Sequence, residues 1–227
     1  MITIIHGDDT GSSRKFFMDK KGKSALPVIK GEDLALLDIK QKIGAGLFEK
    51  PEAIFVEGFI VNSKPGKRLD EVSEYLKKHS KDIDIYFWER KELSKKQLSQ
   101  FGTAVTVETF KIPKNTFGFL DGLRPGNGRR NVELFHSALA GSSDELLFFM
   151  LVRQFRLLLA VSSNSPIGEV KRLAPWQKSK LLSQVRLFTP EQLRKIYKNL
   201  YEIDLGQKTG SLTMPLTQTI DFFLLDL

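Results

Sequence analysis

The feature that most constrains the fold of this chain is a change of pattern near residue 112. Before it, short runs rich in β-branched and aromatic residues alternate with helical segments, and after it no convincing strand is found. Alternation of strands with helices predicts a small α/β layer with a mainly parallel sheet. We therefore expect an α/β domain over residues 1–112 and an all-α helical bundle over residues 113–227.

The elements expected in the first domain follow from short apolar runs and one amphipathic helix. Leu69, Val72 and Leu76 recur at helical spacing with charged residues between them, which predicts a helix with one apolar face. The strands expected are Ile2–His6, Ala53–Val61, Ile83–Trp88 and Ala104–Phe110, and the helices are Asp33–Ile43, Arg68–His79 and Ser94–Phe101.

The expected helices of the second domain are marked by their capping residues. Thr189 precedes Pro190, and Gln192 completes a capping box. Ser143 is placed to cap a long helix, Asp144–Val161. The remaining helices are a short one capped by Asn115 or Thr116, a helix over Arg130–Leu139 and a last helix from Pro215.

Composition excludes several classes of protein. The chain has no cysteine, so disulfides, thiol nucleophiles and cysteine-based metal sites are excluded. Its first residues resemble a strand and not a signal peptide, and the apolar run Leu146–Val152 is far shorter than the roughly 20 residues that cross a bilayer. We expect a cytoplasmic protein with no membrane partner. The net charge of +8 favours a nucleic-acid neighbour, although the basic residues are scattered.

The turn after the first strand lacks the residues of a nucleotide site. Residues Gly7–Arg14 contain two glycines, but no lysine precedes a hydroxyl residue, and Asp8 and Asp9 place negative charge where phosphate would lie. His6 has no second histidine at metal-ligand spacing. We expect no catalytic, nucleotide-binding or metal site, no cofactor, and no intrinsic enzymatic activity.

The helix Asp144–Val161 is apolar on nearly all sides. Either it is the central helix of its bundle, or one face packs on a neighbouring subunit. Arg153, Gln154 and Arg156 interrupt its apolar surface and need polar partners if they are buried.

Three motifs of the second domain resemble a known family. They are the run Arg153–Leu158, the run Gln184–Leu193, and the stretch Glu202–Gly210 that leads into an apolar C-terminus. Their order resembles the collar domain of the delta subunit of the bacterial clamp loader, part of DNA polymerase III. His6-Gly7-Asp8-Asp9 is similar to the start of that family's first domain, a degenerate AAA+ ATPase-like module without a phosphate-binding loop.

The resemblance implies a non-catalytic subunit that binds and opens the sliding clamp for loading onto primed DNA. Its partners would be the clamp and the other clamp-loader subunits, which it meets through the collar at Arg153, Gln154 and Arg156. Contact with primed DNA would be indirect or weak. The chain departs from the family in length, because Ala104–Phe110 and Ile112-Pro113 run almost directly into the collar-like start at Phe117 and leave no room for a complete lid domain.

The pair Leu47–Phe48 is the candidate clamp-binding site. On residue pattern alone, a Leu-Phe pair after a helix belongs to the domain's own core. The family, however, carries such a pair between an early helix and the following strand and inserts it into an apolar pocket of the clamp. The resemblance therefore implies an interface.

Two other functions remain open on the sequence. One is a small degenerate P-loop enzyme, a kinase or ATPase with Gly7–Ser13 around phosphate, which would bind ATP with magnesium. The other is a basic helical DNA-binding module, whose affinity for DNA would depend strongly on salt.

Overall fold

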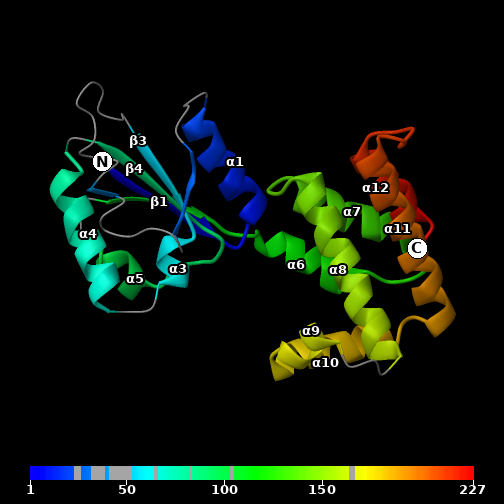
Figure 1. Ribbon diagram of the computed structural model, residues 1–227. Helices are drawn as coiled ribbons and strands as arrows, with labels where there is room; N and C mark the ends of the chain where they lie inside the picture. The colour runs from blue at the N-terminus through cyan, green and yellow to red at the C-terminus, as the bar shows by residue number, and fades with distance from the viewer. Residues whose placement is uncertain are drawn as a thin grey trace. The chain divides into compact units, whose positions relative to one another are not determined.

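The computed structural model describes residues 1–22, 27–31, 39–40, 53–63, 66–81, 83–102, 105–163 and 167–227 (Figure 1). The chain divides into two compact units, Met1–Ile112 and Pro113–Leu227. The division falls where the sequence pattern changes. Among the described residues, no helix has both the length and the apolar character needed to cross a membrane.

The Met1–Ile112 unit is built on a parallel five-stranded sheet. Its strands are ordered β2-β3-β4-β1-β5, and each neighbouring pair is parallel. The expected α/β fold class is thereby confirmed. The strand bounds are β1 Ile2–Gly7, β2 Ile29–Lys30, β3 Ala53–Glu57, β4 Asp84–Glu89 and β5 Val105–Phe110.

Apolar side chains on both faces of the sheet explain why it is covered on two sides. On one face, Ile4 and Phe87 form a core with Leu69, Val72 and Leu76 of helix α4. On the other face, Phe55 and Trp88 pack with Phe17 of helix α1. Figure 1 shows α1 and α4 on opposite sides of the sheet. Strands buried on both faces are typical of parallel sheets. The helices are α1 Thr10–Lys21, α3 Phe59–Asn62, α4 Lys67–His79 and α5 Lys95–Ser99.

The expected strand Ala53–Val61 is wrong in its second half. Strand β3 ends at Glu57, Gly58 takes a left-handed conformation with φ 70°, and a short helical turn, α3, follows. The apolar run continues through the turn because Phe59 and Ile60 are buried there, so periodicity alone could not mark the break. Most of the expected helix Asp33–Ile43 lies outside the described residues.

In the Pro113–Leu227 unit the described residues form helices and turns, as expected of the collar fold class. The helices are α6 Lys114–Gly122, α7 Gly128–Leu139, α8 Asp144–Ser162, α9 Gly168–Arg172, α10 Pro175–Val185, α11 Pro190–Thr209 and α12 Leu216–Leu225. All six other helices contact α8. Leu147, Leu151, Phe155 and Leu158 of α8 are fully buried, so α8 is the central helix of this unit.

Two predicted caps of this unit are confirmed. The Ser143 hydroxyl accepts from the Leu146 N–H at 3.2 Å. The Thr189 hydroxyl accepts from the Gln192 N–H, while the Gln192 side chain accepts from the Thr189 N–H, which completes the capping box.

The cap predicted for the first helix is wrong. Helix α6 begins at Lys114, directly after Pro113. Thr116 is fully buried, and its hydroxyl lies 3.1 Å from that of Ser142. Helices α9 and α10 were not predicted, although the Gln177 side chain accepts from the Ala174 N–H, an arrangement that marks the start of α10.

Replacing Phe155 by Ala should destabilise this unit by about 3–5 kcal/mol, because the buried ring would leave a cavity. Its ring lies 5.8 Å from that of Phe188 and 6.3 Å from that of Phe223. Phe149 is the matched control, because it lies on the same helix with 64% of its surface exposed. Phe149→Ala should change stability by less than about 0.5 kcal/mol. Hydrogen exchange over residues 144–162 of the full chain measures the stability of both variants. Equal losses of amide protection in the two variants would contradict the burial of Phe155.

Candidate functional site

The carboxyl ends of the strands are where parallel α/β folds usually bind ligands. From β1 the chain crosses towards β2 on one side of the sheet, and from β4 it crosses over β1 to β5 on the other side. The connections that leave β1 and β4, which are neighbours in the sheet, therefore run towards opposite edges of the sheet. The residues at this edge decide whether the fold can hold a nucleotide there.

The N-terminus of α1 is capped by the protein's own carboxylate. The Asp9 side chain accepts from the Ser12 N–H at 3.0 Å, and the Asp9 N–H donates to the Phe110 carbonyl at 3.1 Å. In phosphate-binding loops, the free N–H groups of such a helix start bind the phosphate. Here an acidic side chain takes that place.

The turn that precedes α1 lies directly against β5. Gly7 has φ 141°, and a Cβ built on it would lie 1.9 Å from the Phe110 carbonyl oxygen. Glycine is therefore required at this position by close backbone approach. The turn and the end of β5 are held together, and this contact leaves no cradle for phosphate between them.

His6 is a structural residue of the same edge. Its ring is buried, with Nδ1 accepting from the Leu93 N–H at 3.2 Å and Nε2 lying 3.3 Å from the Thr109 hydroxyl. Burial lowers the pKa of His6, so the neutral ring is favoured. Within the described ranges, no group of three or more histidine and acidic side chains is placed to hold a metal ion.

A cluster of charged side chains surrounds Trp88 at this edge. Glu57 forms ion pairs with Arg14 at 3.2 Å and with Arg90 at 2.8 Å. Both guanidinium groups lie over the Trp88 ring, at 4.8 Å for Arg14 and 5.6 Å for Arg90. Partial burial alone would raise the pKa of Glu57, but the hydrogen bonds and charges of the two arginines outweigh it and lower the pKa.

Glu89 was missed by sequence reasoning and is the most buried carboxylate of the described residues, with no exposed surface. Its carboxylate accepts from the N–H groups of Ile60 at 2.7 Å and Val61 at 3.1 Å, and thus holds α3 in place. Desolvation raises the pKa of Glu89 to about 7, against the lowering effect of these backbone bonds. A polar residue at the end of an otherwise apolar strand was the available signal.

The burial of Glu89 predicts a pH-dependent stability. Because the folded pKa lies above the ordinary value of 4.5, the folded state holds the proton more tightly than the unfolded chain. The contribution of Glu89 to the free energy of unfolding is complete below pH 4.5 and is lost as the pH rises through about 7. The free energy of unfolding should fall by an amount on the order of 3 kcal/mol over this range.

Trp88 fluorescence in a Trp176→Phe background reports urea unfolding of this unit, since the chain has only two tryptophans. His6 acts in the opposite direction, because its lowered pKa makes stability rise with pH. The free energy of unfolding is therefore measured against pH for wild type and for Glu89→Gln. The difference between the two slopes is the contribution of Glu89. Identical slopes would contradict the assignment.

The structure leaves the predicted clamp-binding pair untested. Leu47 and Phe48 lie outside the described residues. The nearest described residues are Lys40 before the pair and Ala53, the first residue of β3, after it. A Cβ on Gly31 would lie 2.3 Å from the Phe59 Cα, so the end of β2 packs closely on α3.

The predicted collar residues find their partners within the bundle. Arg153 Nε donates to Glu169 at 2.6 Å, and an Nη group of Arg156 donates to the other oxygen of the same carboxylate. Glu169 thereby joins α9 to α8. Sequence reasoning missed Glu169, although it is the one acidic residue between Glu145 and Glu191.

Gln154 lies inside the unit. Its amide donates to the Gln184 side chain at 2.6 Å, and Gln184 in turn donates to the carbonyls of Leu120 at 2.8 Å and Leu123 at 3.3 Å. These bonds satisfy polar groups that would be costly if buried without partners. They also connect three helices, α6, α8 and α10.

Comparisons with known proteins place this fold in a family. The family model described as DNA polymerase III delta subunit, C-terminal domain, matches residues 113–227. Among solved structures, the DNA clamp loader delta protein (YqeN) of Bacillus subtilis is similar at 13% identity and a TM-score of 0.41, over 99% of this chain and 94% of that chain. No curated protein matches the sequence. On the family match over its second unit, the chain belongs to the DNA polymerase III delta subunits.

Proposed function

We propose that this chain binds the sliding clamp and holds it open for loading, and that it does so without chemistry of its own. The observation that carries the proposal is the family match over the whole Pro113–Leu227 unit. The edge of the sheet in the first unit supports it, because Asp9 and the close approach of Gly7 to Phe110 occupy the place of a phosphate loop.

The proposal assigns one role to each unit. Residues 1–112 bind the clamp through Leu47 and Phe48, and residues 113–227 form the collar that joins the other clamp-loader subunits. Contact with primed DNA is indirect or weak in this assignment. Opening the clamp requires only that the chain binds the open form more tightly than the closed form, because a ligand shifts an equilibrium by its difference in affinity.

Replacing Leu47 and Phe48 together by Ala should weaken binding of the cognate clamp by several kcal/mol, because side chains that anchor an interface in a desolvated pocket cost about 2 kcal/mol or more when truncated. Titration of purified clamp with the full chain, followed by calorimetry, measures the loss. The Phe149→Ala variant, which removes an exposed ring from the other unit, is the control and should bind the clamp normally. If the double variant binds like wild type, this site is wrong.

The ion pairs of Glu169 lead to the reciprocal prediction for the collar. Arg156→Ala removes one of the two arginines that hold α9 on α8, and we expect weaker assembly with the other clamp-loader subunits or a less stable bundle. Clamp binding should remain nearly intact. Size-exclusion chromatography of the reconstituted complex gives the first readout and clamp titration the second.

The opposite result is equally informative. An Arg156→Ala chain that assembles normally but no longer binds the clamp would contradict the division of roles between the two units. Glu169→Gln is the matched variant, because it weakens the same two ion pairs from the other side and should reproduce the effect of Arg156→Ala.

A further inference from the structure

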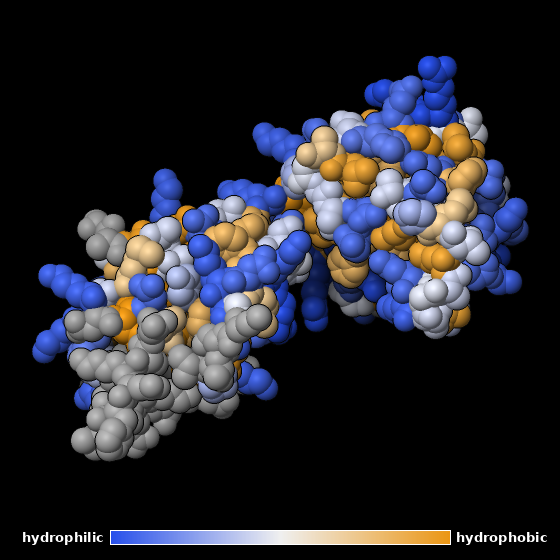
Figure 2. All heavy atoms as spheres, turned by 90° about the horizontal axis from the view of Figure 1, so that it is seen from above, coloured by the Kyte–Doolittle hydropathy of each residue, from blue (hydrophilic) through white to orange (hydrophobic). Residues whose placement is uncertain are grey.

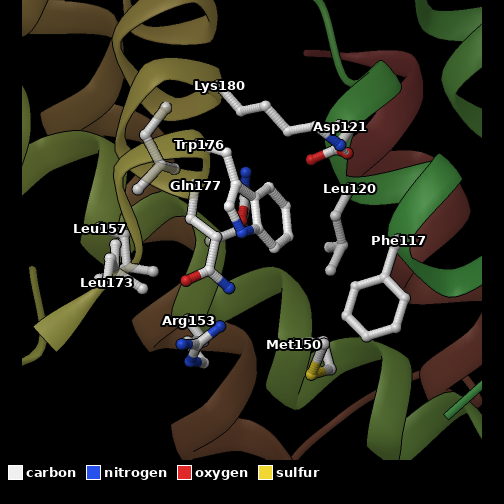
Figure 3. A pocket seen from close by; sticks show the side chains of 12 residues that line it. Phe117, Leu120, Asp121, Met150, Arg153, Leu157, Leu173, Trp176, Gln177 and Lys180 are labelled. Atoms are coloured by element: carbon white, nitrogen blue, oxygen red, sulfur yellow. Dashed lines mark hydrogen bonds and ion pairs between the residues drawn. The ribbon is translucent and has the colours of Figure 1, made fainter.

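The helical unit contains a pocket whose lining includes two of the predicted collar residues, Arg153 and Gln154. It opens between α6, α8 and α10 and has a volume of about 160 Å³ (Figure 3). Leu120, Leu157 and Leu181 line it with apolar surface, and all three are buried. Figure 2 shows that apolar side chains gather in several separate patches on the visible face of this unit.

The size of the pocket matches one aromatic ring. An apolar protein cavity of about 150 Å³ binds benzene, and this pocket is of the same size. Its polar groups are already engaged within the chain, since Gln154 is bonded to Gln184 and Gln177 to Ala174. A nucleic-acid base would leave its hydrogen-bonding edge unpaired here, which is costly. The lining therefore favours an all-carbon ring.

Two large aromatic side chains stand at the mouth of the pocket and remain in contact with water. Trp176 is 62% exposed and Phe117 is 48% exposed. Figure 3 shows their rings on opposite sides of Leu120. A bound partner that covers both rings would remove their apolar surface from water, which favours association.

The surroundings of the pocket are positively charged. The stretch from residue 167 to 187 contains one acidic residue, Glu169, which is already bound by Arg153 and Arg156. The same stretch contains five basic residues: Lys171, Arg172, Lys178, Lys180 and Arg186. At the mouth, Lys180 reaches across to Asp121 with a separation of 2.6 Å (Figure 3). This charge balance complements an acidic ligand.

We propose that the pocket is a docking site for an acidic peptide segment of a partner protein, which inserts one phenylalanine ring between Trp176 and Phe117. The apolar lining receives the ring, and the basic residues of α9 and α10 attract the carboxylates that flank it. A single aromatic anchor in a pocket with a charged rim is a common mode of peptide recognition.

A fluorescein-labelled synthetic peptide of aspartates and glycines with one central phenylalanine is the probe, titrated into the full chain and followed by anisotropy. We expect saturable binding that weakens at least about tenfold when the phenylalanine is replaced by alanine or the aspartates by lysines. Trp176→Ala should weaken binding by a similar factor. Lys180→Ala should also weaken it, because the Asp121 carboxylate is then left unpaired at the mouth.

Phe222→Ala is the matched control, since this ring is 56% exposed on α12 and does not line the pocket. It should bind the peptide like wild type, and every variant should keep the helical circular dichroism of wild type. Absence of saturable binding, or equal binding by the Trp176→Ala chain, would overturn the proposal. Trp176-dependent binding of single-stranded oligothymidine in place of the peptide would overturn it as well. Clamp binding by Trp176→Ala should be unchanged, which separates this result from that of the clamp experiments.

Discussion

The burial of α8 is the constraint on which the second unit depends. Each of the other helices in this unit packs on α8, so its residues must be apolar on almost every side. Polar side chains on the buried faces of such a helix need partners from neighbouring helices. Glu169 of α9 meets this need for Arg153 and Arg156, and Gln184 of α10 meets it for Gln154. Arg153, Gln154 and Arg156 of the family motif therefore form hydrogen bonds and ion pairs inside the bundle.

The first unit combines a ligand-binding type of sheet with a turn that its own side chains fill. The sheet order and the strand-turn-helix at β1 and α1 are those of a ligand-binding α/β layer. At the critical turn, however, the Asp9 carboxylate satisfies the N–H of Ser12, and Gly7 packs against Phe110. An acidic cap stabilises a helix start in the same way that a bound phosphate would. The fold keeps its geometry while the site for chemistry is closed.

The sequence alone predicted the structural features that depend on residues adjacent in the chain. The caps at Ser143 and Thr189 could be predicted because each depends on a few adjacent side chains. The break at Gly58 could not, because Glu89 stabilises the turn from a distant strand. Glu169 was missed, and Gln184 was not predicted to pair with Gln154, for the same reason, since the partners of both residues lie far along the chain. For Leu47 and Phe48, pattern alone favoured the core, and only the family resemblance indicated an interface.

The central claim is that this chain contributes clamp opening to a complex whose other subunits supply the chemistry. Reconstitution with the organism's remaining clamp-loader subunits tests it directly, with loading of the clamp onto primed circular DNA as the measured quantity. We expect ATP-dependent loading that requires this chain, and no binding of ATP by the chain alone. Equal loading by the complex that lacks the chain would contradict the account.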